Sequence, residues 1–196
     1  MLGMVLLYVG AVLIVNGIWL IGQARVAAPA AAGAAAVDAE AHPTFIQNRE
    51  VAVLNLFTGF VGVLAAVTLA VHGDANEDNA AIRGAAYTLL FAFTYLWVAY
   101  NNYVGAGGHA FGWYCLFVAA TAVFAGAYTF SNADGNDASI YLGVCWLAWA
   151  VLWFLFFVLL ALERPIAKVT GALAVVEGIG TGWIFGLLLL EGELAF

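Results

Sequence analysis

Six long apolar stretches limit this chain to a fold that crosses a lipid bilayer several times. An α-helix needs about 20 apolar residues to cross ~30 Å of hydrocarbon, and each stretch is long enough. Only the last contains a charged side chain, Glu177, and charged residues make up 9% of the sequence, against about 25% in soluble domains. The runs are continuous rather than alternating, which disfavours the strands of a membrane β-barrel. The predicted spans are residues 2–22, 51–71, 84–104, 110–131, 139–162 and 169–190.

These spans predict an all-α integral membrane protein that forms one domain over residues 1–196. The connections are short except for residues 23–49, an Ala-rich run that we expect to be a loose or partly helical linker without a core of its own. A Leu-Leu-aromatic motif at residues 6–8 recurs at residues 89–91. This weak repeat agrees with a fold built from repeated two-helix hairpins.

The few basic residues predict the orientation of the spans. Connections after odd-numbered spans carry most of them, and the only one after an even-numbered span is Arg83. The others are Arg25, Arg49, Arg164 and Lys168. Because basic residues near span ends favour the cytoplasmic side, we expect both termini outside and the long linker inside.

The fifth span carries three tryptophans, Trp146, Trp149 and Trp153, at spacings i, i+3 and i+7. On a helix these side chains fall within about 60° of one another. Tryptophan normally collects at the membrane surface, so a buried stripe indicates either tight helix packing or a passage lined by aromatic faces. In the third span Phe91 and Tyr95 are i, i+4 neighbours, and such aromatics more often belong to a core.

Glu177 is the one ionisable side chain inside a span. Such a group costs about 2.5–3.5 kcal/mol on insertion scales and is kept where it faces a cavity or a partner. Thr181 lies one turn further on the same face, and glycines around both would let another helix approach closely. The pair indicates either an interhelical hydrogen bond or, as we favour, a polar anchor beside a pathway.

The first span offers another one-sided stripe, which consists of Leu6, Val9, Leu13 and Asn16. Three aliphatic groups followed by an amide suit the lining of a narrow pore as well as ordinary packing. Periodicity alone favours packing.

Catalytic and metal-binding patterns are absent from the sequence, so we expect neither an enzyme nor a cofactor. His42, His72 and His109 fall in or beside predicted loops at wide spacing. A formal net charge of −7 leaves no basic surface for nucleic acid. A passage for a neutral polar solute is compatible with so little charge inside the spans.

Five segments together resemble the AmiS/UreI family of urea and short-chain amide channels. They are residues 1–10 with Asn16-Gly17, residues 89–96, 113–119 and 146–153, and Glu177-Gly178. The resemblance implies a six-helix protomer of three two-helix hairpins around its own pore. It also implies a homohexamer in a bacterial cytoplasmic membrane with both termini outside.

Carried over by position, the resemblance implies a constriction and a lining for that pore. The constriction would comprise Trp149, Trp153, Leu152, Phe91 and Tyr95, beside Trp146. Leu6, Val9, Leu13 and Asn16 would line the pore, with Glu177 and Thr181 as polar groups. We therefore expect a passive channel for urea or small neutral amides that supplies a cytoplasmic urease or amidase. The alternatives are a proton-coupled transporter that uses Glu177, and a membrane enzyme or scaffold without a pore.

The outer loops depart from the acid-gated members of the family. Those members depend on outer-loop histidines, which change charge near pH 6. Residues 132–138 contain no histidine, and the other outer loop has only His72. We therefore expect a channel that is open at neutral pH.

Overall fold

The computed structural model describes residues 1–31 and 45–196. Within this part of the chain the secondary structure is helical, and six spans are long and apolar enough to cross a membrane, as predicted. The first five are α1 (Leu2–Ala31), α2 (Asn48–Ala75), α3 (Asn79–Val104), α4 (His109–Ser131) and α5 (Asp137–Leu160). The sixth comprises α6 (Ala167–Glu177), a π-helix η2 (Gly178–Ile184) and α7 (Phe185–Leu190).

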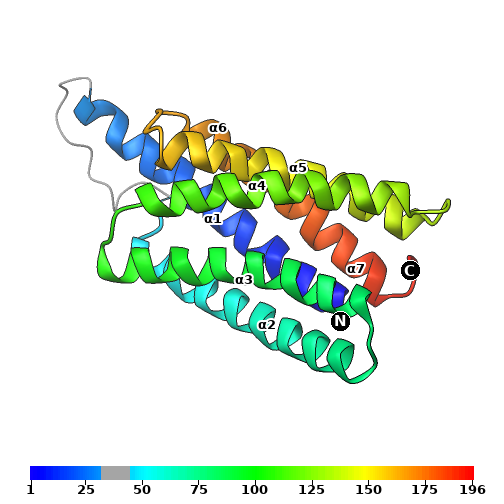
Figure 1. The fold of residues 1–196 in the computed structure, drawn as a ribbon. Coiled ribbons are helices and arrows are strands. Elements are labelled where there is room, and N and C mark those ends of the chain that lie inside the picture. The colour runs from blue at the N-terminus through cyan, green and yellow to red at the C-terminus, as the bar shows by residue number, and fades with distance from the viewer. Residues whose placement is uncertain (32–44) are drawn as a thin grey trace.

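The predicted linker 23–49 is partly helical at both ends. Helix α1 continues past the apolar run to Ala31, and α2 begins at Asn48. The middle of the linker, which includes His42, lies outside the described residues. Figure 1 shows both chain termini at the end of the bundle opposite the end of α1 and the start of α2.

Short polar motifs set the helix ends. The Asp78 carboxylate accepts hydrogen bonds from the backbone N–H groups of Ala80 and Ala81, at 2.9 and 3.1 Å, and so begins α3. Asn136 caps α5 in the same way. Helix α3 ends at Gly105, whose φ of 72° lies in the left-handed region that glycine tolerates.

The helices pack as three pairs. Helix α2 packs along α3, α4 along α5, and α1 along the sixth span, so the third pair joins the two ends of the chain. In Figure 1, α1 runs through the middle of the bundle between the other helices. The polar and aromatic groups of the spans therefore converge around α1.

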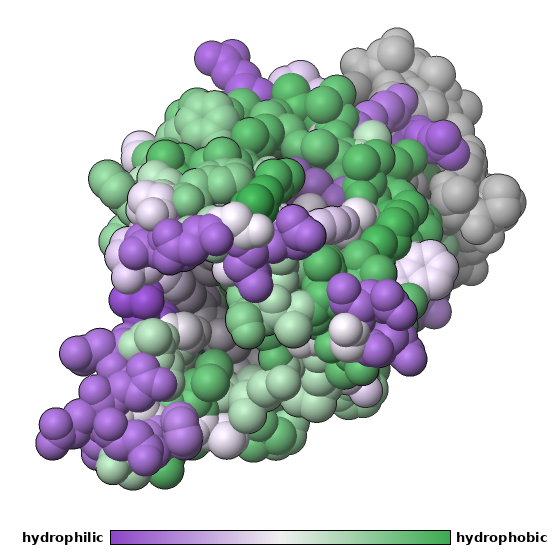
Figure 2. Space-filling model, turned by 90° about the vertical axis from the view of Figure 1, so that its right-hand side faces the viewer, coloured by the Kyte–Doolittle hydropathy of each residue, from purple (hydrophilic) through white to green (hydrophobic). Residues whose placement is uncertain are grey.

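The outside of the bundle is apolar. Phe60, Phe117, Phe124 and Val176 are at least half exposed, and they come from three different spans. Figure 2 shows hydrophilic residues gathered in patches on the end that faces the viewer, with apolar surface around them. Such a surface is stable against lipid or against another protein copy.

Candidate functional site

Phe91 of α3 faces the three indoles of α5. Its ring stacks on Trp153 with centroids 4.5 Å apart and planes 11° apart. It also contacts Trp146 at 5.1 Å and the edge of Trp149 at 5.2 Å. Since stacked rings at this distance are in van der Waals contact, no flat solute fits between Phe91 and Trp153 unless the rings separate. A route through the bundle therefore runs beside this ring pair or requires the rings to move.

The stripe on α1 points toward these aromatics. Val9 and Leu13 pack with Tyr95 of α3 and Leu152 of α5 in one buried cluster, and Leu6 belongs to the cluster that holds the indoles. All the predicted pore residues are buried, except Phe91, which is partly buried. Periodicity thus identified a buried face on each of these helices.

A small cavity of about 40 Å³ lies on the linker side of the ring pair. Its lining includes five predicted residues: Leu13, Asn16, Tyr95, Leu152 and Trp153. Among the described residues, no group hydrogen-bonds to the buried hydroxyl of Tyr95. At about 10–15 Å³ per water centre, the space holds about three waters or a small solute. We call it the inner cavity.

Glu177 lies at the boundary between α6 and the π-helix. Its side chain is buried, and within the described part of the chain its Oε2 atom has no hydrogen-bond partner. Thr181 Oγ1 donates to the Glu177 backbone oxygen at 2.6 Å, and Trp149 Nε1 donates to Thr181 Oγ1 at 2.8 Å. The indole of the predicted stripe is thereby oriented by the span that carries the carboxyl group.

The π-helix was not predicted from the sequence. Single π-turns within α-helices occur frequently at functional sites because they redirect backbone groups. Here the Tyr141 hydroxyl of α5 donates to the Gly180 oxygen at 2.9 Å. The available signal was the spacing Gly178-x-Gly180-x-Gly182 directly after the buried Glu177.

Asn55 of α2 is a second residue that the sequence reasoning missed. It exchanges side-chain hydrogen bonds with Asn16, at 3.0 and 2.7 Å, and also donates to the Val51 oxygen at 2.9 Å. Its side chain is fully buried. The signal was a lone amide in an apolar span, which usually has a partner on another helix.

Helix α1 meets the sixth span through a glycine seam. The seam consists of Gly3, Gly10 and Gly17 of α1 with Gly171, Gly182 and Gly186 of the sixth span. A Cβ atom on Gly10 would lie 2.5 Å from the Trp183 nitrogen, and one on Gly171 would lie 2.7 Å from the Gly17 oxygen. The two backbones are therefore in direct contact on either side of Glu177.

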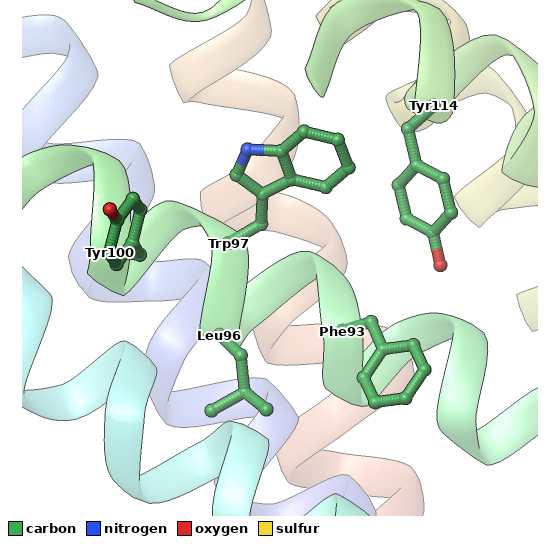
Figure 3. Close-up of a pocket in the computed structure, with 5 residues that line it drawn as sticks. All are labelled: Phe93, Leu96, Trp97, Tyr100 and Tyr114. Carbon is green, nitrogen blue, oxygen red and sulfur yellow. The ribbon is translucent and has the colours of Figure 1, made fainter. Parts of the chain in front are cut away.

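A separate groove opens on the outside between α3 and α4. Its lining residues are Phe93, Leu96, Trp97 and Tyr100 of α3 and Tyr114 of α4, which Figure 3 shows. Trp97 and Tyr114 face each other with ring centroids 5.5 Å apart, and the Tyr114 hydroxyl donates to the Leu90 oxygen at 3.1 Å. None of the predicted pore residues lines it. This groove is separate from the inner cavity.

The family comparison agrees with this arrangement of six spans around buried aromatics. The AmiS/UreI family transporter model matches residues 33–193. The chain belongs to the AmiS/UreI family. This membership confirms the resemblance found in the sequence and identifies a transport protein rather than an enzyme.

Individual relatives of this AmiS/UreI chain carry two kinds of name. A Mycolicibacterium smegmatis protein named as a transporter of amidate substrates is 36% identical over 97% of this chain and 77% of its own length. An acid-activated urea channel of Helicobacter pylori is 34% identical over 96% of this chain and 97% of its own length.

Solved structures of the Helicobacter pylori urea channel match the whole fold. The crystal structure superimposes with a TM-score of 0.78, and a cryo-EM structure in a closed state with 0.77. Both are 32% identical in sequence, and each comparison covers 100% of both chains.

Proposed function

We propose that this AmiS/UreI protein is a passive, bidirectional channel for urea and small neutral amides. The observation that carries the proposal is the ring pair of Phe91 and Trp153, with a small, partly polar cavity directly beside it. The names of the relatives, a urea channel and an amidate transporter, support both solute types.

The chemistry of the lining suits a flat, uncharged molecule. Aromatic faces can hold the plane of urea, while isolated polar groups such as the Tyr95 hydroxyl and the Asn16 amide can bind its ends. Weak contacts at several points permit entry without trapping, which conduction requires. Hydrated ions would find too few groups to replace their water.

Passive flow is favoured over proton coupling because the spans carry a single carboxyl group, Glu177, and no intramembrane base to relay a proton from it. The partnerless Oε2 atom of Glu177 is the observation that supports the second candidate, a transporter driven by a proton gradient. In that case Glu177 would gain and lose a proton during each cycle.

We also propose that the channel is not acid-gated. The outer loops are short, and His72 is the only histidine near them. The side-chain amide of Asn76 lies 3.3 Å from Nδ1 of its ring, at the same helix end. No second histidine of the described residues shares this loop to amplify a change in charge.

The surroundings of the channel follow from the family and from the surface. We propose a homohexamer in a bacterial cytoplasmic membrane, with the termini outside and a urease or amidase that consumes the solute inside. The basic residues at the linker end and the broad apolar exterior support this placement.

Proteoliposomes provide the test. Under a urea or acetamide gradient, a channel should give fast shrinkage and recovery that scale linearly with solute and ignore a pH gradient. Saturable uptake that requires the pH gradient would favour the coupled transporter. Flux equal to that of empty vesicles would leave only a protein without a pore.

A further inference from the structure

Trp19 of α1 connects the lining of the inner cavity with that of a second, open pocket at the linker end. The indole lines the inner cavity, while its Nε1 donates at 3.0 Å to Asn48 Oδ1. Asn48 and Gln23 line the second pocket, which has a volume of about 480 Å³. The side chain of Trp19 is thus part of the wall that a solute would meet between the cavity and this pocket.

Asn48 collects two hydrogen bonds from α1. Besides the bond from Trp19, its Oδ1 atom accepts from Gln23 Nε2 at 3.3 Å. Gln23 Nε2 also donates to the Ile46 oxygen at 3.0 Å, which ties the start of α2 to α1. These contacts hold the indole in the lining of the inner cavity.

We propose that Trp19 forms an inner constriction that selects solutes by size, and that Asn48 and Gln23 hold it in its closed position. This inference rests on the proposed channel function. The indole belongs to the lining of the inner cavity and is bonded to a residue of the second pocket. Residues 16, 19 and 23 follow i, i+3, i+7 spacing, so the constriction continues the face of α1 that lines the inner cavity.

The hydrogen bonds at this constriction are of the kind that an amide solute makes. An N–H group of urea can donate to Asn48 Oδ1, and its carbonyl can accept from Trp19 Nε1 or Gln23 Nε2. A passing amide can therefore replace each bond that it breaks, while an ion or an alkane cannot. A longer alkyl chain gains nothing from this exchange and meets the indole ring.

Two substitutions of Trp19 separate its size from its hydrogen bond. Trp19→Ala should raise the permeability ratio of propionamide to urea about tenfold, the discrimination that one or two carbons typically provide in a fitted pocket. Trp19→Phe keeps a ring and should change the ratio less. Because it removes one hydrogen bond, we expect the urea flux to rise about two- to tenfold.

Asn48→Ala tests the same hydrogen bond by removing its acceptor, Asn48 Oδ1. It should raise the urea flux at least as much as Trp19→Phe, because it removes the bond from Trp19 and also the bond from Gln23, and the double variant should not exceed Asn48→Ala alone. Trp113→Ala is the matched control. Trp113 is a half-exposed indole at the same end of the bundle that bonds to His109 on its own helix and lines neither space.

The measurement is stopped-flow shrinkage of proteoliposomes with urea, acetamide and propionamide, normalised to the amount of inserted protein. If the parent protein conducts urea but Trp19→Ala leaves the permeability ratio at its parent value, the proposal of an inner constriction at Trp19 is wrong, while the proposed channel function is unaffected. If the parent protein conducts none of the three solutes, the proposed function itself fails. Additive effects of Trp19→Phe and Asn48→Ala would overturn the role of Asn48.

Discussion

The two walls around the inner part of this protein are built in opposite ways. Helix α1 meets the sixth span through the glycine seam, where backbone touches backbone. Helices α3 and α5 meet through large rings, with Phe91 against three indoles. Side chains can change rotamer without helix movement, whereas a backbone seam has no such freedom. The seam therefore fixes the helix that carries Glu177, whereas the rings are free to adjust to a solute.

The largest effect that we expect is the loss of folding caused by a large side chain in the glycine seam. Gly10→Leu should prevent stable folding, because its Cβ alone would lie 2.5 Å from the Trp183 nitrogen and the backbone cannot yield. Size-exclusion chromatography in detergent should show aggregate in place of a single oligomer. Gly180→Ala is the control in the same span, since a Cβ there meets no atom within 4 Å. A well-behaved Gly10→Leu protein would contradict the rigid seam.

A change in the opposite wall should leave the fold intact and alter transport. Trp153→Ala removes the ring that stacks on Phe91, so we expect the permeability ratio of acetamide to urea to change about tenfold or more. Phe124→Ala, which removes an exposed ring from the apolar exterior, should leave this ratio unchanged. Unchanged ratios in both variants would remove Trp153 from the constriction.

Substitutions of Glu177 test whether the wall formed by α1 and the sixth span supports urea flux through hydrogen bonding or through charge. Glu177→Gln preserves shape and polarity and should retain most urea flux. Glu177→Leu removes the polar group and should reduce flux about tenfold, in line with about 1–3 kcal/mol for an unmet polar partner. Flux under opposing pH gradients is the measurement. Abolition of gradient-driven uptake by Glu177→Gln would favour the proton-coupled alternative.

The amide pair of α1 and α2 should make a smaller contribution, to stability. Asn55→Ala leaves Asn16 without its reciprocal hydrogen bonds, and we expect the free energy of unfolding to fall by between about 0.6 kcal/mol, the average for polar contacts between membrane helices, and about 1.7 kcal/mol, the maximum. Thermal unfolding in detergent should show a lower midpoint. Thr121→Ala provides a control, because the Thr121 hydroxyl bonds only to the Phe117 oxygen of its own helix on an exposed face.

The smallest change that we expect is the change in urea flux when the pH is varied. Urea flux between pH 5 and 8 should stay within a few-fold, because the two walls lack histidine and His72 is the only histidine beside the loops at the end of the bundle that carries the chain termini. His72→Ala should leave the profile unchanged. A steep rise in flux on acidification that disappears in His72→Ala would show that a single histidine is enough to gate the channel.

Much of the fold could be predicted from the sequence because each membrane span is a continuous apolar run. The same holds for the buried faces, since Trp146, Trp149 and Trp153 share one side of a helix whatever surrounds it. The polar partners were harder to find. Asn55 and Asn48 lie 39 and 29 residues from the side chains they bind, and no short-range spacing connects them.

The sequence by itself determined the number of spans, the membrane as their solvent and the side of each helix that is buried, because hydropathy and helical periodicity are local properties. Only the tertiary structure decided that Phe91 stacks on Trp153, that Gly10 meets the π-helix, and that Trp19 lines the inner cavity. These contacts depend on the rotation and register of one helix against another. That choice is made by close packing between distant segments, which no single span encodes.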